Sequence, residues 1–365
     1  MFWFYVAALF SLAFLIVVHE AGHYFVARRC GMKIERFSIG FGPGILKRKS
    51  KKTGTTFQIA PIPFGGFVEI RGMNIAEDVD PDDRAAYPNR PTWQRFITIF
   101  AGPATNYLSA IVVMFVLYAT FGMQSTWGWY GVAEVKDTYD AHGKLDPGDR
   151  ILAVDHQPLL ARGDHDGVHA DSLVKRINAK AGQPVTLTIE RDGKRFDVDI
   201  QPKLAKDDAG KELLQDGKPY YLVGIVPTEQ TEFVDVPLSE AAANAAYFPI
   251  DQTVFIASQV RDIFSGKVKA DPRGPKGIFD EFAKAWKLGP FTGLYLVAAL
   301  SVYLGLFNLL PIPALDGGRL VFLLYEMVTR RRANPKIEAM VHMAGIMVLG
   351  VVMILVTMRD FGVFS

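Results

Sequence analysis

The feature that most constrains the fold is an apolar run, Phe2–Val18, that leads directly into "HEAGH" at 19–23. A run of this length predicts a membrane-spanning helix, because about 20 apolar residues cross the hydrocarbon layer. Three further runs follow it, at Phe96–Thr120, Phe291–Leu310 and Val341–Val356. No Lys or Arg precedes the first run and no small-residue cleavage pattern follows it, so we expect a retained span and not a signal peptide. The sequence therefore predicts a polytopic α-helical membrane protein with about four transmembrane helices.

Basic residues cluster in the loops that follow the first and third apolar runs. "KRKSKK" lies at 47–52 and "RRR" at 330–332, whereas the long segment 125–287 contains more acidic than basic residues. Because Lys and Arg are enriched in cytoplasmic loops, we expect both basic loops in the cytoplasm and the long segment outside. The net charge of +2 is too small to indicate a nucleic-acid partner.

The stretches between the apolar runs predict two β-containing parts and one helix. Residues 34–72 alternate β-forming residues with Gly and Pro, which predicts a membrane-associated β-element on the cytoplasmic side. Beyond the second run, strand-like segments surround a short helix and a turn at Asp192-Gly193, which predicts a small α+β domain. Residues 237–264 predict an amphipathic helix on the membrane surface, with Ser239 as its N-cap. We expect an N-terminal membrane part (1–121), an inserted domain (122–203), a region after that domain (204–290) and a C-terminal membrane part (291–365).

The "HEAGH" sequence places two imidazoles and a carboxylate close together on one helix. His19 and His23 are one helical turn apart and face the same way, so both can bind one metal ion. Glu20 lies beside them, where its carboxylate can take a proton from a metal-bound water. Zinc suits two neutral nitrogens, a third protein ligand and an open water position. The alternative is that these are interfacial side chains at a helix end, with no metal.

A third ligand is expected near the end of the third apolar run. The sequence "LGLFNLLPIPALDGGRL" at 304–320 holds Asp316 after two prolines, and it holds Asn308 inside the run. A carboxylate at membrane depth is costly without a partner, and a cation bound by two histidines would be such a partner. The metzincin arrangement is excluded, because Val26 and Arg29 occupy the positions of its glycine and third histidine.

Together these motifs resemble the site-2 protease family of intramembrane zinc metalloproteases, and within it the bacterial regulator of sigma-E protease branch. The resemblance rests on "HEAGH" and "NLLPIPALDGG", with "GFGP", "PFGGFVEIRGM" and "FAGPATNYLSA" between them. It covers essentially the whole chain and includes a middle segment with room for one PDZ-like domain. It implies a zinc endopeptidase of the bacterial inner membrane, with the active site toward the cytoplasm and the PDZ-like domain in the periplasm.

The resemblance also implies roles for individual residues. His19, His23 and Asp316 would bind Zn²⁺, and Glu20 would be the general base and acid. Asn308 would contact the substrate or the developing oxyanion.

A second group of residues is expected to bind the substrate. The segment Phe57–Arg71 resembles the β-element that is thought to hold substrate by strand addition in this family, and it contains Gly65, Gly66 and Phe67. A helical peptide must unwind before cleavage, and an exposed strand edge can pair with the backbone groups that unwinding frees. Asn106, in "GPATN", is a further candidate substrate contact, with packing or capping as the alternative.

The expected partners are the lipid bilayer and single-span membrane proteins, such as an anti-sigma factor that another protease has already trimmed outside. Remnant signal peptides are a second substrate class, and the PDZ-like domain would bind a peptide or act as a size filter. A non-catalytic membrane scaffold with a PDZ domain is the alternative from a different class, and the intact motif residues argue against it. A transporter is disfavoured, because the sequence shows no inverted repeat.

Overall fold

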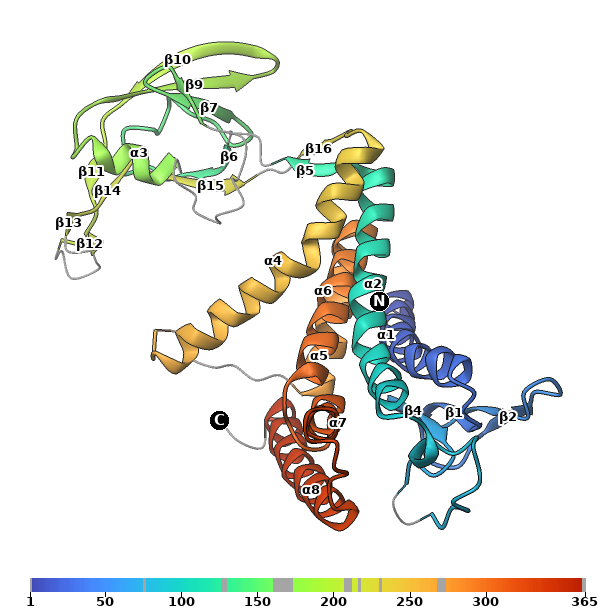
Figure 1. Cartoon of the computed structure of the whole chain (residues 1–365). Coiled ribbons are helices and arrows are strands. Elements are labelled where there is room, and N and C mark those ends of the chain that lie inside the picture. Colours follow the sequence, from blue (N-terminus) through green and yellow to red (C-terminus); the bar gives the residue numbers. More distant parts are fainter. Residues whose placement is uncertain are drawn as a thin grey trace. The chain divides into compact units, whose positions relative to one another are not determined.

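The computed structural model describes residues 2–74, 77–125, 130–159, 173–206, 212–215, 218–229, 232–267 and 274–362. The described residues form two compact units, shown in Figure 1: residues 1–120 with 237–365, and residues 121–236. We describe each unit by itself.

The first unit is mainly helical. Its helices are α1 (Phe2–Arg29), α2 (Thr92–Phe121), α4 (Leu238–Phe264), α5 (Pro275–Leu288), α6 (Pro290–Leu309), α7 (Asp316–Thr329) and α8 (Pro335–Asp360). By length and composition, α1, α2, α6 and α8 are able to cross a membrane. Each of these four contains most or all of one of the apolar runs, so the prediction of about four candidate spans is confirmed.

Local sequence explains where these helices begin and end. α1 continues through the "HEAGH" sequence to Arg29, and Gly31, with φ of 73°, follows its end. A glycine in the left-handed region is a common helix terminator, because it lacks the steric penalty of a Cβ. α6 begins with Pro290 in its first turn and ends two residues before Pro311, which has no N–H to continue the helix. α4 begins after Pro237 without a side-chain cap, so the predicted N-cap role of Ser239 is wrong.

α6 lies at the centre of the helical packing. One core cluster joins it to α1 and α5 through Ala8, Leu15, Phe282 and Val297. Another joins it to α2 and α4, and includes Met114, Phe248 and Val302. α1, the span that carries His19 and His23, therefore packs against α6, the helix that precedes Asp316.

The segment between α1 and α2 forms a four-stranded sheet with the order β2-β3-β1-β4. Its strands are β1 (Ile34–Phe41), β2 (Leu46–Lys49), β3 (Thr56–Ile59) and β4 (Ile62–Ile70). β1 pairs in parallel with β3 and antiparallel with β4. β4 lies at one edge of the sheet and contacts α1, so the predicted β-element is a sheet whose edge strand lies against the first span.

The second unit is an α+β structure around a sheet of order β10-β9-β7-β6-β15, with β8 on β7. These strands are β6 (Tyr130–Val135), β7 (Arg150–Val154), β8 (Gln157–Pro158), β9 (Val185–Arg191), β10 (Lys194–Ile200) and β15 (Ile225–Glu229). α3 (Leu173–Ala179) contributes Leu173 and Ile177 to the core. Positive φ angles at Asp192 and Gly193 fit the tight turn predicted between β9 and β10. Three two-stranded pairs complete the unit: β5 (Met123–Ser125) with β16 (Glu232–Val234), β11 (Lys203–Leu204) with β14 (Tyr221–Leu222), and β12 (Leu214–Gln215) with β13 (Lys218–Pro219).

Candidate metal centre

α1 presents His19 and His23 on one face, one turn apart, and both are buried. Their Nε2 atoms lie 3.3 Å from each other. The two rings are nearly perpendicular, at 83°, so the nitrogens converge and the rings do not stack. This is the arrangement that an i, i+4 pair on a helix gives when both imidazoles face one point.

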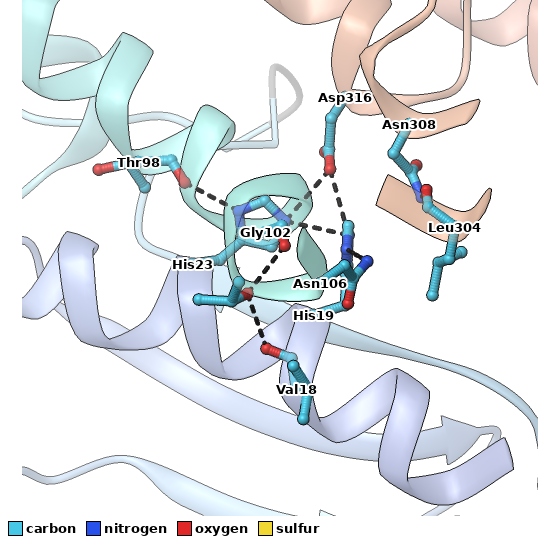
Figure 2. Close-up of polar contacts among 10 residues, drawn as sticks. Val18, His19, His23, Thr98, Gly102, Asn106, Leu304, Asn308 and Asp316 are labelled. Carbon is cyan, nitrogen blue, oxygen red and sulfur yellow. Dashed lines mark hydrogen bonds and ion pairs between the residues drawn. The ribbon is translucent and has the colours of Figure 1, made fainter. Parts of the chain in front are cut away.

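Asp316, the first residue of α7, completes the cluster (Figure 2). Its Oδ2 lies 3.2 Å from Nε2 of His19 and 3.3 Å from Nε2 of His23. One possible ligand atom from each of the three residues lies within 4.8 Å of the others. The structure thus brings together three residues separated by almost the whole sequence, as the sequence predicted.

The donor set itself indicates which metal fits. Two imidazole nitrogens and one carboxylate oxygen are typical of catalytic zinc sites, which leave a fourth position for water. The lone pairs of two neutral imidazole nitrogens and one carboxylate oxygen repel one another at 3.2–3.3 Å when no cation or proton lies between them. The three residues therefore fit a zinc ion.

The Nδ1 atom of each imidazole, on the side of the ring away from the cluster, faces a polar group of α2. Nδ1 of His23 lies 2.8 Å from the backbone carbonyl of Thr98, and Nδ1 of His19 lies 3.0 Å from Nδ2 of Asn106. Pro103 lies inside α2 and has no N–H to donate to the carbonyl of Ile99, so the helix can bend in the turn that also contains Thr98. Sequence reasoning missed Thr98, because a backbone carbonyl leaves no trace in the choice of side chain.

α1 and α2 approach so closely that glycine is required at their contact. A Cβ at Gly102 would lie 2.2 Å from Nε2 of His23, and a Cβ at Gly22 would lie 2.3 Å from the carbonyl oxygen of Ala101. Thr105 adds a hydrogen bond from its Oγ1 to the carbonyl of Val18, at 3.0 Å. Gly102 therefore provides the space that the imidazole of His23 occupies.

The loop before Asp316 is folded tightly against the start of α7. A Cβ at Gly317 would lie 1.9 Å from the carbonyl oxygen of Leu310, so only glycine allows this approach. Ala314 has φ of 78°, which is unfavourable for a residue with a Cβ. Its backbone N–H donates to Nδ1 of His342 on α8, at 3.2 Å. His342 thereby helps to hold the loop that carries the carboxylate, and this backbone hydrogen bond agrees with the expectation from the sequence that His342 bonds to backbone and is not a fourth ligand.

Glu20 lies between the imidazole pair and strand β4. Its carboxylate interacts electrostatically with His19, His23 and Asp316, and it accepts a hydrogen bond from the backbone of Val68. The carboxyl group of Glu20 is therefore close to the point where the three candidate ligands meet.

The two glycines of β4 have packing explanations in this structure. A Cβ at Gly66 would lie 2.7 Å from Cγ2 of Ile16 and 3.2 Å from Cγ of Glu20, so Gly66 lets β4 approach α1. Gly65 has φ of 152°, and a Cβ there would lie 2.1 Å from the ring of Phe41.

The remaining candidates contact residues outside the cluster. The ring of Phe67 stacks on Phe41 with 6.4 Å between the ring centroids. Asn308 donates from Nδ2 to the carbonyl of Leu304 in its own helix, at 2.9 Å (Figure 2). Asn106 contacts His19, whereas in the part of the chain that the structure describes Gly65, Phe67 and Asn308 make no hydrogen bond or ion pair with the three clustered residues.

A buried ion pair connects α2 to α7 beyond the cluster. Arg95, of which 6% is exposed, pairs with Glu326, and Thr92 also donates to that carboxylate at 2.9 Å. Because Asp316 and Glu326 lie on the same helix, this pair fixes α7 against α2.

The chain is similar to known proteins that are named as metalloproteases. The profile of Peptidase family M50 matches residues 7–352. A Mesorhizobium japonicum protein whose name describes a zinc metalloprotease is 32% identical over 358 residues, covering 93% of this chain and 94% of that protein. Metalloprotease MmpA of Caulobacter vibrioides is 31% identical, covering 94% of this chain and 92% of that protein. A Fusobacterium nucleatum protein, also named for a zinc metalloprotease, is 31% identical and covers 98% of each chain.

Proposed function

Because the chain belongs to peptidase family M50, the site-2 protease family, we propose that it is an intramembrane endopeptidase that cleaves the membrane-spanning segments of single-span proteins. The chain is a multi-pass membrane metalloprotease, and zinc is its metal, in keeping with the names of its relatives. The single observation that carries the proposal is the convergence of His19 and His23 from α1 with Asp316 from α7, two helices of the first unit.

In this proposal His19 and His23 bind zinc through Nε2 and Asp316 binds it through Oδ2. When bound, zinc supplies Lewis-acid activation of a water molecule. The contacts on Nδ1 of both imidazoles fix the ring orientations, so the Nε2 lone pairs point to one position. The hydrogen bond and packing around the loop before Asp316 hold the carboxylate opposite them.

Glu20 is the proton carrier of the reaction. Its carboxylate takes a proton from the attacking water and later gives one to the leaving amine, which is the general base and acid role. Its position beside the ligands and against β4 puts that carboxylate between the metal position and the strand where substrate would lie. Asn308 is assigned to the substrate carbonyl or its oxyanion, since it lies in the last turn of α6, directly before the loop that carries Asp316.

Strand β4 is the proposed substrate-binding edge. It lies at the end of the sheet order, and one of its sides pairs with β1. A substrate helix that unwinds loses its internal hydrogen bonds, and the backbone of an edge strand can replace them. Gly65, Gly66 and Phe67 belong to this strand, which runs past Glu20.

The arrangement in the membrane follows from charge. The basic residues of the segment between α1 and α2, and "RRR" at 330–332, favour a cytoplasmic location for the sheet and the metal centre. The unit of residues 121–236 would then lie outside, in the periplasm of an inner-membrane protein, where we propose that its domain at 122–203 is a PDZ-like filter or peptide reader. An anti-sigma factor trimmed by another protease is the proposed type of substrate, with remnant signal peptides as the second.

Substitution of Glu20 by Gln tests the proposed function. The change keeps size and removes the proton-accepting charge, so zinc content should stay at one ion per chain and cleavage of a model single-span substrate should fall by about 10²–10⁴-fold. Glu35→Gln is the matched control, because Glu35 lies on β1, outside the helix that carries Glu20, and its side chain is 42% exposed and paired with Lys33. Cleavage by Glu20→Gln at the rate of the control would refute the catalytic role of Glu20, whereas absence of cleavage by the natural protein would favour a non-catalytic scaffold.

A further inference from the structure

In the side-chain amide of Asn106, the nitrogen has a hydrogen-bond partner and the oxygen has none among the described residues. Asn106 is fully buried in α2, and its Nδ2 lies 3.0 Å from Nδ1 of His19. Its Oδ1 is buried with no hydrogen-bond partner among the described residues. A buried acceptor without a partner costs about 1–3 kcal/mol, so its presence beside a metal-binding histidine requires an explanation.

The backbone of Asn106 is firmly held while its side-chain amide can turn. Its carbonyl accepts hydrogen bonds from Ser109 Oγ at 2.9 Å and from Ser301 Oγ at 3.0 Å. The oxygen and nitrogen of a side-chain amide exchange places in a half turn that leaves the occupied volume nearly unchanged. Both orientations are therefore available in the same buried space.

The two orientations suit different forms of the neighbouring imidazole. In the orientation seen here the amide donates to Nδ1 of His19, which leaves the ring proton on Nε2, facing Oδ2 of Asp316 at 3.2 Å. A metal ligand must instead offer the lone pair of Nε2, so that Nδ1 carries the proton and needs an acceptor. Turning the amide places Oδ1 opposite that proton and gives the unpartnered oxygen its hydrogen bond.

The partner of the second histidine cannot make this exchange. Nδ1 of His23 faces the backbone carbonyl of Thr98, which only accepts, so the lone pair of its Nε2 always faces the centre. The two imidazoles are thus held by different kinds of partner, one fixed and one reversible.

We propose that Asn106 is a positioning residue whose amide turns over when the metal enters, donating to Nδ1 of His19 in the metal-free protein and accepting from it in the metal-bound protein. This inference rests on the proposed function, because it takes His19 as a zinc ligand through Nε2. It assigns to Asn106 a role in metal affinity in place of a substrate contact.

Zinc affinity of full-length variants, measured by competition with a chromophoric chelator, tests the proposal. Asn106→Leu keeps the volume but accepts no hydrogen bond, and we expect zinc to bind about 10–100-fold more weakly, the range for lost partners of ligating histidines. Asn106→Asp keeps an acceptor for the Nδ1 proton, and we expect its affinity to stay within about threefold of the natural protein. At saturating zinc, Asn106→Leu should keep the KM for a model substrate.

Each other outcome has a defined meaning. Unchanged zinc affinity in Asn106→Leu, or equal losses in the Leu and Asp variants, would overturn the proposal, as would full zinc affinity combined with a raised KM. Thermal unfolding of both variants at saturating zinc, compared with the natural protein, separates loss of folding from loss of metal. His19→Ala distinguishes the two levels of the argument, because zinc binding that survives this change would refute the proposed ligand set itself.

Discussion

Replacement of Gly102 by Ala should disable the metal centre without touching a ligand. The new Cβ would lie 2.2 Å from Nε2, 2.5 Å from Cε1 and 2.9 Å from Cδ2 of the His23 ring. Non-bonded carbon contacts are favourable at about 3.5–4.0 Å, so the ring or the helix would have to move by about 1 Å. The carbonyl of Thr98 holds the ring from its other side, which makes an easy rotation away from α2 unfavourable.

The size of the expected effect follows from that displacement. Metal–ligand distances tolerate deviations of about 0.2 Å, so a shift of about 1 Å removes His23 as an effective ligand. We expect zinc affinity to fall at least 100-fold and cleavage to fall in parallel, as expected for a displacement of about 1 Å at a catalytic site. The overpacking itself should lower the free energy of unfolding by about 1–3 kcal/mol.

A matched substitution separates this packing effect from helix propensity. Gly350 also lies inside a long apolar helix, α8, and a Cβ there would meet no atom within 4 Å. Gly350→Ala should therefore leave zinc content and cleavage unchanged, with up to about 1 kcal/mol of added helix stability. The assay is metal content after dialysis against a weak chelator, together with cleavage of a model substrate. Full zinc content and activity in Gly102→Ala would refute the close packing of His23 against α2.

Two further outcomes are expected. His342→Phe keeps an aromatic ring but removes the acceptor for the N–H of Ala314, so zinc affinity should fall about five- to tenfold, which corresponds to about 1 kcal/mol. Adding Ala314→Gly should restore part of that affinity, because glycine tolerates the left-handed backbone at this position. Equal zinc affinity in His342→Phe and the natural protein would contradict this role. In the second unit, burial raises the pKa of Asp149, but bonds from Arg191 at 2.6 and 2.7 Å and from the N–H of Asp146 outweigh it and lower that pKa below its usual value. A carboxyl with a lowered pKa stabilises the folded state above its unfolded pKa of about 3.9 and loses that contribution as pH falls through the folded value. Denaturant unfolding of this unit should therefore become easier below about pH 4. Asp149→Asn should weaken that dependence, to which Asp140 and Asp155 also contribute because hydrogen bonds from lysines lower their pKa values, and it should cost about 1.5–3 kcal/mol at pH 7. An unchanged acid dependence in the variant would refute the assignment.

The meeting of His19, His23 and Asp316 was predictable because these residues are conspicuous in any context. Two histidines one turn apart at the end of an apolar run, and an aspartate after a proline-broken run, are each costly without a metal. Their long separation in the chain did not hide them, since the apolar runs already indicated helices that pack together. The spans were likewise predictable from hydrophobicity, although α1 extends to Arg29, well beyond Val18.

Two helices of the first unit, α5 and α7, were not predicted, and the structure shows why. α5 has charged residues along one face, such as Lys276 and Asp280, and it was assigned to the polar middle segment, yet Phe282 on its other face is fully buried. α7 follows the prolines so closely that the sequence suggested only a turn, although it carries Asp316 at its first position.

The supporting contacts were harder to predict than the ligands. The carbonyl of Thr98 has no side-chain signature, and the bond from Ala314 to His342 depends on how α8 packs against a loop. Gly66 was expected to allow close backbone approach, and in the structure the missing Cβ leaves space for Ile16 and Glu20, while its contact with substrate stays a prediction. In each case the tertiary contact decides the role, and a single sequence does not specify it.

X-ray absorption at the zinc edge of the purified protein tests the central claim most directly. A metal held by His19, His23 and Asp316 should give two imidazole nitrogens at about 2.0–2.1 Å and oxygen ligands at about 2.0–2.2 Å. Asp316→Ala should change the oxygen shell, and His19→Ala should remove one nitrogen. A spectrum without imidazole scattering, or one with a sulfur ligand at about 2.3 Å from the chain's single cysteine, Cys30, would contradict the account.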